Sequence, residues 1–309
     1  MMSKLVSTKN MPKSEWLKWR KKGIGGSEAG TVCGFNPYAS VMQVYYDKIS
    51  DEIDEIDNEA MRLGRDLEEY VARRFTETTG KKVRRANAMF YDEKNPFMFA
   101  DVDRMVVGEN AGLEIKTASP YAESSWTDGK IPLHYQMQCF HYMSVCNADA
   151  WYVAVLILGR GFQYYKLERD EELIQSLIQI EKNFWENHVL KRIPPQPDGS
   201  DVANKVLAEQ FKNCSGIMIP LSGFDEKLKR RFEVMELMEK LKAEKNQIDQ
   251  EVKLFMGNAE VAENEKYFVS WKPVITNQID SKLLKEEQPE IYKRYQKETC
   301  SRRFVVKAA

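Results

Sequence analysis

Several residue types that mark familiar protein classes are scarce in this chain of 309 residues. It holds three histidines, His134, His141 and His188, too few to favour a histidine-based nuclease or a Ser-His-Asp hydrolase. The five cysteines are scattered and form no CxxC pair, which argues against a disulfide framework and against a structural zinc or iron–sulfur site. We interpret the histidines as structural and most of the cysteines as small buried hydrophobic residues.

The chain also lacks long apolar runs and a strong charge of one sign. No apolar stretch approaches the roughly 18 residues of a membrane span, and residues 1–12 lack the apolar segment of a secretory signal. These absences predict no membrane partner and a cytoplasmic protein. The formal net charge of −1 argues against a uniformly basic nucleic-acid coat protein, but a nuclease needs positive charge only along its substrate channel.

The order of the predicted elements indicates an α/β or α+β fold, with a central mixed sheet flanked by helices. Helical and alternating apolar patterns, ended by turns with glycine, proline and asparagine, predict where each helix and strand begins and ends. The predicted helices cover 14–22 (with Ser14 as N-cap), 28 onward, 41–48, 59–79, 133–146 and 171–190. The predicted strands cover 82–85, 88–91, 97–100, 103–107, 113–117, 150–158 and 162–168, and residues 51–57 form a surface loop or a helix start.

The only proline-dense stretch, 194–199, predicts a domain boundary. We therefore expect a core domain over 1–195 and a C-terminal extension over 196–309. A long amphipathic helix over about 225–256 dominates the extension, followed by a strand at 267–274, a helix at 281–295 and a strand at 303–306. The apolar stripe of the long helix fits packing on its own domain as well as it fits an intermolecular coiled coil.

The pattern that carries chemistry is Asp103, followed after a glycine-containing turn by Glu114, Ile115 and Lys116. On a strand, Glu114 and Lys116 project to the same side while Ile115 enters the core. An antiparallel strand that begins at Asp103 would bring a second carboxylate beside Glu114, and two such carboxylates repel unless a cation lies between them. Mg²⁺ suits such oxygen ligands. An isolated ExK on an edge strand is commonly a solvated ion pair, and the preceding aspartate favours the metal site.

Two flanking segments extend this pattern. Upstream, residues 64–70 place Glu68 and Glu69 on a helix, and downstream, residues 135–143 place Gln136 and Gln138 on another. With the GiGgS turn at 23–27 and the arginine before it, the chain resembles the YqaJ-type viral recombinase family, phage exonucleases related to lambda exonuclease. The landmarks cover about 16–169 in matching order. The resemblance implies the restriction-endonuclease-like PD-(D/E)xK core.

The resemblance implies a role for each residue of the central pattern. Asp103 and Glu114 would ligate metal together with the backbone carbonyl of Ile115, and Lys116 would orient or activate the attacking water. The metal would be Mg²⁺, for which Mn²⁺ can substitute, with two ions in the active complex. The residue before Asp103 is Val102, whereas the PD-(D/E)xK motif is named for a proline at this position. Asp101 shares the strand face, but the spacing to Glu114 favours Asp103 as the ligand.

The flanking residues receive roles by the same resemblance. Glu68, rather than Glu69, would support a second metal or its water. Gln138, rather than Gln136, would lie beside the reactive site. Arg20 and Ser27 would hold a 5′-terminal phosphate, for which a fork-shaped guanidinium with a hydroxyl and turn amides is physically suited.

The implied function is a Mg²⁺-dependent 5′-to-3′ exonuclease on double-stranded DNA that leaves 3′ single strands for phage-type recombination. The family also implies a ring-shaped homo-oligomer, a single-strand annealing partner, and a phage or prophage gene in a bacterial host. One alternative is another PD-(D/E)xK nuclease, an endonuclease or a Cas4-like exonuclease, although the chain lacks a cysteine quartet. The other is a non-catalytic DNA-binding or assembly module that works through the long helix.

Overall fold

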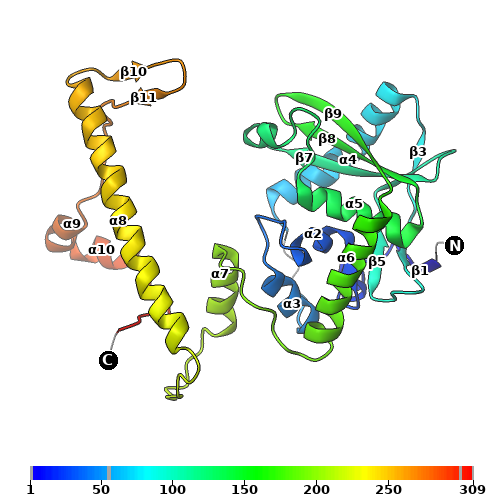
Figure 1. Cartoon of the computed structure of the whole chain (residues 1–309), viewed down its shortest axis with the longest axis horizontal. Helices are drawn as coiled ribbons and strands as arrows, with labels where there is room; N and C mark the ends of the chain where they lie inside the picture. The colour runs from blue at the N-terminus through cyan, green and yellow to red at the C-terminus, as the bar shows by residue number, and fades with distance from the viewer. Residues whose placement is uncertain (1–2, 54–56, 299–300, 308–309) are drawn as a thin grey trace. The chain divides into compact units, whose positions relative to one another are not determined.

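The computed structural model describes residues 3–53, 57–298 and 301–307, so residues 54–56 of the predicted 51–57 loop and Cys300 lie outside the described residues. The chain forms two compact units, 1–211 and 212–309, which are described separately below (Figure 1). The first unit extends past the proline-rich stretch through α7 (Asp201–Gln210), whose Ala203 is buried. The division of the chain into independently folding domains at 195 stays a prediction.

The first unit is built on a five-stranded mixed sheet in the order β3-β6-β7-β8-β9 (Figure 1). Its strands are β3 (Val83–Arg84), β6 (Arg104–Val106), β7 (Ala111–Ala118), β8 (Ala150–Ile157) and β9 (Gly161–Glu168). The pair β7–β8 is parallel and the other pairs are antiparallel. Between the parallel strands, the chain runs through η1 (Pro120–Ser125) and α5 (Leu133–Cys146). This arrangement confirms the predicted mixed sheet flanked by helices.

The apolar strand β8 is covered on both faces, as its composition predicts. Val153 and Val155 belong to one buried cluster, which includes residues of α5 and of α6 (Glu171–Phe184). The intervening Ala154 belongs to a second cluster with Phe75 of α4 (Glu59–Thr79). Since each fully buried aliphatic or aromatic side chain contributes about 1.5–3 kcal/mol, these two layers hold the central strands rigidly in place.

Helix α4 begins and ends where the sequence predicts. The Asn58 side chain accepts a hydrogen bond from the Met61 amide, which caps the first turn. Gly80 ends the helix with φ of 73°, a left-handed conformation that strains residues with a side chain. This helix positions Glu68 and Glu69 to form ion pairs with Arg104, the first residue of β6.

A second sheet, in the order β1-β4-β5-β2, combines strands from the start of the chain with strands from residues 88–101. It consists of β1 (Ser3–Ser7), β4 (Ala88–Tyr91), β5 (Met98–Asp101) and β2 (Ile24–Gly25). The parallel pairing of β2 with β5, Ile24 with Met98 and Gly25 with Phe99, brings the glycine turn close to the end of β5. The expected turn at 23–27 therefore contains a short strand that local sequence could not reveal.

The helices beside this sheet differ from prediction at their starts. Helix α1 (Lys13–Arg20) begins after Pro12 without a side-chain cap, so the prediction of Ser14 as N-cap is wrong. Proline fixes φ near the helical value, which suits it to a helix start. Helix α2 (Gly26–Val32) begins two residues before Glu28, which instead accepts a hydrogen bond from the Gly25 amide. Helix α3 (Val41–Ile49) matches its prediction to within a residue.

The helix predicted over 171–190 is α-helical only to Phe184, after which Trp185–Val189 forms a π-helical turn (η2). No sequence pattern marks this change, because the apolar spacing continues across it. Neither α7 nor the 3₁₀ turn η1 was predicted, since both are short segments rich in polar or small residues.

The second unit consists of a long helix and short elements. Helix α8 (Asp225–Met256) has its predicted limits and is followed by the hairpin β10 (Val261–Glu263) and β11 (Phe268–Ser270). The predicted helix at 281–295 is divided into α9 (Ser281–Glu287) and α10 (Pro289–Tyr295), because proline cannot continue a helix from the preceding turn. The strand predicted at 303–306 is wrong, since these described residues form no regular element.

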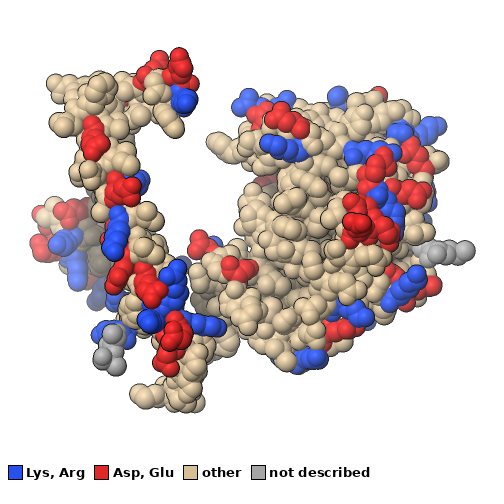
Figure 2. All heavy atoms as spheres, in the orientation of Figure 1, with Lys and Arg blue, Asp and Glu red and all other residues tan. Residues whose placement is uncertain are grey.

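Most side chains of α8 are exposed, and acidic and basic residues alternate with uncharged ones along its visible face (Figure 2). Within the described residues, no helix has both the length and the apolar character needed to cross a bilayer.

Candidate active site

Strand β7 delivers the central carboxylate and lysine. Glu114 and Lys116 point to the same side, where the Lys116 ammonium lies 2.6 Å from Glu114 Oε1. Ile115 between them is buried in the cluster that includes Phe75. The alternation that the sequence predicts is therefore observed, and it gives a nearly solvent-free ion pair, since the two side chains are 4% and 19% exposed.

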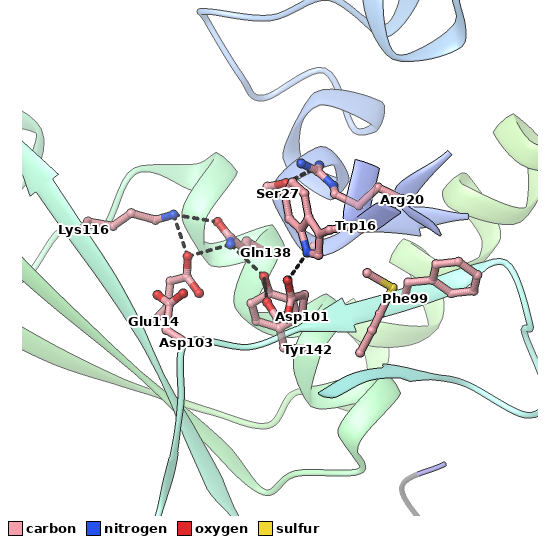
Figure 3. A pocket seen from close by; sticks show the side chains of 13 residues that line it. Trp16, Arg20, Ser27, Phe99, Asp101, Asp103, Glu114, Lys116, Gln138 and Tyr142 are labelled. Atoms are coloured by element: carbon pink, nitrogen blue, oxygen red, sulfur yellow. Dashed lines mark hydrogen bonds and ion pairs between the residues drawn. The ribbon is translucent and has the colours of Figure 1, made fainter. Parts of the chain in front are cut away.

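Asp103 lies beside this pair. It precedes β6, which begins at Arg104, rather than opening the strand as predicted. The antiparallel register pairs Arg104 with Leu113, and Asp103 Oδ2 accepts a hydrogen bond of 2.8 Å from the Ile115 amide. A backbone amide thus anchors one carboxylate oxygen, and Figure 3 shows the Asp103 and Glu114 side chains next to each other.

The two carboxylates occupy an environment that opposes their charge. Burial, and then the nearby Glu114 carboxylate, raise the pKa of Asp103 well above its ordinary value. Burial also raises the pKa of Glu114, against the lowering effects of Lys116 and Gln138. Among the described residues, Glu114 Oε2 is buried without a hydrogen-bond partner. An unpaired buried carboxylate oxygen is costly, so this site favours an added cation.

The residues present fit a hard divalent cation. Two adjacent carboxylates, one with an unpartnered oxygen, supply the oxygen ligands that Mg²⁺ prefers, and water and phosphate oxygens complete its coordination in many enzymes. In the described part of the chain, no three His, Cys, Asp or Glu side chains are already gathered around one point. The fit therefore rests on Asp103 and Glu114.

Glu68 lies near these carboxylates but is held by another residue. Its negative charge raises the pKa of Asp103 and of Glu114, although in each case burial is the largest cause. The buried Arg104 guanidinium pairs with Glu68 and also donates to Glu69 Oε2 at 3.0 Å. Glu69 is 73% exposed and Glu68 only 30%, which agrees with the preference for Glu68.

Helix α5 brings Gln138, and not Gln136, to the carboxylates. Gln138 Nε2 donates to Glu114 Oε1 at 2.7 Å, and its Oε1 accepts from Lys116 Nζ at 3.1 Å. Gln136 instead donates to the Ile131 carbonyl at 2.7 Å. One amide therefore bridges both members of the ion pair and fixes their orientation.

Tyr142, one turn further along α5, connects this group to the glycine turn. Its hydroxyl accepts from Gln138 at 3.0 Å and donates to the Asp101 carbonyl at 3.1 Å. The ring lies so close to Gly26 that a Cβ there would be 2.3 Å from Tyr142 Cε1. Glycine at this position is thus needed for α2 to approach α5.

Arg20 and Ser27 lie together, as the resemblance implies. Arg20 Nη2 donates to Ser27 Oγ at 2.9 Å and lies 3.2 Å from Glu28 Oε1. The guanidinium is 4.9 Å from the centre of the Trp16 ring, at a distance typical of a cation–π contact. Arg20 is thereby held in one orientation by groups on α1 and α2.

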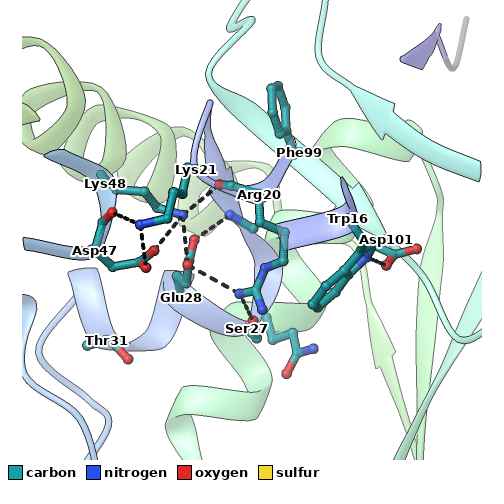
Figure 4. A network of polar contacts seen from close by, with 12 residues as sticks. Trp16, Arg20, Lys21, Ser27, Glu28, Thr31, Asp47, Lys48, Phe99 and Asp101 are labelled. Atoms are coloured by element: carbon teal, nitrogen blue, oxygen red, sulfur yellow. Dashed lines mark hydrogen bonds and ion pairs between the residues drawn. The ribbon is translucent and has the colours of Figure 1, made fainter. Parts of the chain in front are cut away.

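Glu28 and Lys48 form a support for Arg20 that the sequence did not reveal (Figure 4). The Lys48 ammonium is fully buried and donates to the Arg20 carbonyl at 2.7 Å and to Glu28 Oε1 at 2.8 Å. Burial works against ionisation, yet Lys48 and Arg20 together lower the pKa of Glu28 below its ordinary value. The capping position of Glu28 could have suggested it, whereas nothing in the sequence marks Lys48.

Trp16, which was not predicted, and Asp101, which was weighed only as an alternative to Asp103, are further residues of the site. The Trp16 indole N–H donates to Asp101 Oδ2, and Asp101 ends β5 (Figures 3 and 4). Trp16 and Arg20 are four residues apart on one helix, so their contact was available from helical spacing. Burial raises the pKa of Asp101 above its ordinary value.

A single cavity of about 220 Å³ joins these groups (Figure 3). Six of the predicted residues contribute to its wall: Arg20, Ser27, Asp103, Glu114, Lys116 and Gln138. Trp16, Asp101 and Tyr142 also line it. Glu68, paired with Arg104, is not among the lining residues, and its predicted role and that of the Ile115 carbonyl stay predictions.

The mixed sheet flanked by helices, with Glu114 and Lys116 on β7 and Asp103 directly before β6, defines a protein with the PD-(D/E)xK nuclease fold. Two structures of LHK-Exo, the alkaline exonuclease from Laribacter hongkongensis, one in complex with dAMP, share this fold. Each superposes with a TM-score of 0.50 at 20% or 18% identity, covering 58% of this chain and 93% of the other.

The family follows from sequence comparison. The profile of the YqaJ-like viral recombinase domain matches residues 15–149. The uncharacterized protein YqaJ of Bacillus subtilis (strain 168) is 36% identical over 308 residues, which cover 98% of this chain and 97% of that protein. The chain therefore belongs to the YqaJ-like viral recombinase family, and its family and fold together support a nuclease.

Proposed function

We propose that this protein is a Mg²⁺-dependent 5′-to-3′ exonuclease that degrades one strand of double-stranded DNA and leaves a 3′ single strand for phage-type recombination. The observation that carries the proposal is the shared cavity, in which a carboxylate–lysine group and an Arg20–Ser27 group face one space. The first group suits phosphodiester hydrolysis, and the second suits recognition of a terminal phosphate.

Asp103 and Glu114 would hold the cation, with the Ile115 carbonyl as a further ligand and Glu68 supporting a second ion. When bound, Mg²⁺ supplies Lewis-acid stabilisation of negative charge, and Mn²⁺ can substitute for it. Lys116, held by Glu114 and Gln138, directs its ammonium toward the space in which water attacks the phosphate. Gln138 fixes the positions of the lysine and the carboxylate relative to each other, because its amide forms hydrogen bonds with both.

Arg20 and Ser27 would bind the 5′-terminal phosphate. A guanidinium and a hydroxyl provide charge-assisted hydrogen bonds to a phosphate dianion. Trp16, Glu28 and Lys48 hold Arg20 in place before DNA arrives, which reduces the entropy lost on binding. By family resemblance, we further propose a ring-shaped homo-oligomer and a single-strand annealing partner.

A cleavage assay on matched substrates tests the proposal. Linear duplex DNA with 5′-phosphates, the same duplex with 5′-hydroxyl ends, and a closed circular duplex are incubated with the protein and Mg²⁺. We expect degradation of the linear phosphorylated duplex, slower degradation of the hydroxyl form and an intact circle. Cleavage of the circle would contradict an exonuclease, and a lack of Mg²⁺-dependent cleavage of every substrate would contradict a nuclease.

A further inference from the structure

A second hollow in the first unit shares no lining residue with the candidate active site. It has a volume of about 300 Å³ and is formed by the end of α1, the turn between β4 and β5, and the α6–η2 helix. We call it the lysine hollow and define it by six lining residues: Lys22, Lys94, Phe97, Lys182, Trp185 and Leu190.

The lysine hollow has an excess of positive charge. Three ammonium groups line it, against the single carboxylate of Glu186. The contact between Lys182 and Glu186 is long, 3.9 Å, and both side chains are about half exposed, so it neutralises little charge. The Lys22 ammonium lies 4.0 Å from the centre of the Trp19 ring, a contact that leaves its hydrogen-bond donors available to an anion.

Aromatic rings give the hollow a flat apolar part. Phe97 and Trp185 are nearly parallel, with an angle of 17° between planes and 6.4 Å between ring centres. Phe97 is buried, whereas Trp185 is partly exposed and lies in the π-helical turn. Turns of this kind are rare and occur often at functional sites. Cations around an exposed aromatic ring are the combination with which proteins bind unpaired nucleotides.

The hollow adjoins the site where the 5′ end would bind. Lys22 follows Arg20 by two residues, and Phe97 precedes the cavity-lining Phe99 by two, which corresponds to about 7 Å along an extended chain. The chain runs from Lys22 at the hollow through the glycine turn to Gly25 at the cavity, and the Phe97 carbonyl accepts a hydrogen bond of 2.6 Å from the Ile24 amide of that turn. A strand that separates from its partner at the cavity would reach the hollow within a few nucleotides.

We propose that the lysine hollow binds the unpaired 3′-terminated strand of the DNA end, through its phosphates and one stacked base. This inference rests on the proposed exonuclease function, which would leave such a strand at each step. Lys22, Lys94 and Lys182 contact the phosphates, and the partly exposed ring of Trp185 stacks on the base. An acidic segment of a partner protein could contact the same lysines, but its binding would not require a position beside the DNA end, which the unpaired strand does require.

Binding measurements with the full chain carrying Lys116→Ala, which keeps the DNA intact, test this inference. The probes are a blunt 5′-phosphorylated duplex and the same duplex with a 3′ oligothymidine tail, each followed by fluorescence anisotropy at several salt concentrations. Lys22→Ala and Lys182→Ala are compared with Lys205→Ala, which removes an exposed lysine from α7 in the same unit. All three variants lose one positive charge.

We expect the tailed duplex to bind the starting protein several-fold more tightly than the blunt one. Lys22→Ala and Lys182→Ala should each remove most of this advantage and lower the salt slope by about 0.7, while Lys205→Ala leaves both unchanged. Equal weakening of both probes, or an equal effect of Lys205→Ala, would overturn the inference. Displacement by polyglutamate but not by oligothymidine would assign the hollow to an acidic peptide instead.

The outcome is separable from that of the proposed function. If the wild-type chain degrades linear DNA and the hollow variants bind both probes like the starting protein, only the hollow is excluded. If the wild-type chain degrades no DNA, the exonuclease proposal fails whatever the binding data show.

Discussion

The two ends of the candidate active site distribute their charges in opposite ways. At one end, the partly exposed carboxylate of Asp103 and the buried carboxylate of Glu114 face the single ammonium of Lys116, and Glu114 Oε2 has no partner among the described residues. At the other end, two cations, Arg20 and Lys48, share the carboxylate of Glu28. The first end is short of positive charge and the second is short of negative charge. Together they complement a metal cation and a phosphate dianion.

The difference shows why each end must be supported separately. The acidic end is built from neighbouring strands and one helix, so its geometry follows from the sheet register. The basic end depends on side chains from three helices, which meet only after α1, α2 and α3 pack together. Substitutions at the two ends should therefore affect different properties.

The largest effect is expected at Glu114. Glu114→Gln removes a proposed metal ligand and the partner of Lys116, and we expect cleavage of linear duplex to fall by about 10³-fold or more. The initial rate with saturating Mg²⁺ measures it. Asp101→Asn in the same cavity serves as the control and should retain far more activity. Equal losses of activity in both variants would contradict a specific role of Glu114 as a metal ligand.

The next effect is on stability. Lys48→Met removes the fully buried cation of Glu28, which keeps Arg20 as a partner, so the unfolding free energy should fall by at most about 3–5 kcal/mol, the cost of breaking a buried pair. Urea unfolding followed by circular dichroism measures this loss. Lys166→Met, at a pair that is about half exposed, should cost at most about 1 kcal/mol. If the two variants unfold alike, Lys48 does not support the basic end.

A smaller and more selective effect is expected from Arg20→Ala. Loss of a charged hydrogen-bond donor costs about 1.5–3 kcal/mol, which corresponds to a roughly 10- to 100-fold lower kcat/KM on the 5′-phosphorylated duplex. The 5′-hydroxyl duplex should be cleaved at nearly its former rate. Arg20→Lys should recover part of the preference, because lysine keeps the charge but not the fork. A proportional loss on both substrates would contradict a phosphate-binding role.

The smallest effect concerns His141, which is buried outside the cavity. Burial opposes its charge, but the Glu181 carboxylate 2.8 Å from Nδ1 and the bond to the Phe99 carbonyl raise the pKa of His141 above its ordinary value. A raised folded-state pKa stabilises the fold fully below about 6.5 and loses this contribution as pH rises through the folded value.

Unfolding free energy should therefore decline between mildly acidic and alkaline pH. His141→Gln should flatten this part of the profile while leaving the metal dependence of cleavage in place. An unchanged slope in the variant would show that other groups cause the decline.

Local sequence predicted the parts of the fold that depend on local interactions. Helices α4 and α5 have the expected limits because apolar spacing and the Gly80 stop act within a few residues. The prediction of a strand at 303–306 was wrong, because an alternating pattern forms no stable strand without a neighbouring strand to pair with. The division between α9 and α10 at Pro289 was visible in the sequence and was outweighed by the helical pattern around it.

In the candidate site too, contacts between residues placed by local structure were predicted, and contacts that depend on tertiary packing were not. Glu114, Lys116 and Gln138 meet as expected, because strand alternation and one helix turn position them. Lys48 could not be predicted, since it reaches Glu28 from twenty residues away, across the packing of two helices. Trp16 was within reach through its spacing to Arg20, but its bond to Asp101 depends on the pairing of β2 with β5.

The central claim is that Asp103 and Glu114 hold the catalytic cation, and calorimetric titration of the DNA-free protein with Mg²⁺ tests it most directly. Wild type, Asp103→Asn and Asp101→Asn are compared, since both aspartates line the cavity but Asp101 is already bonded to Trp16. We predict that Mg²⁺ binding is retained in Asp101→Asn and lost in Asp103→Asn. Unchanged binding in Asp103→Asn, or loss in Asp101→Asn alone, would contradict the claim.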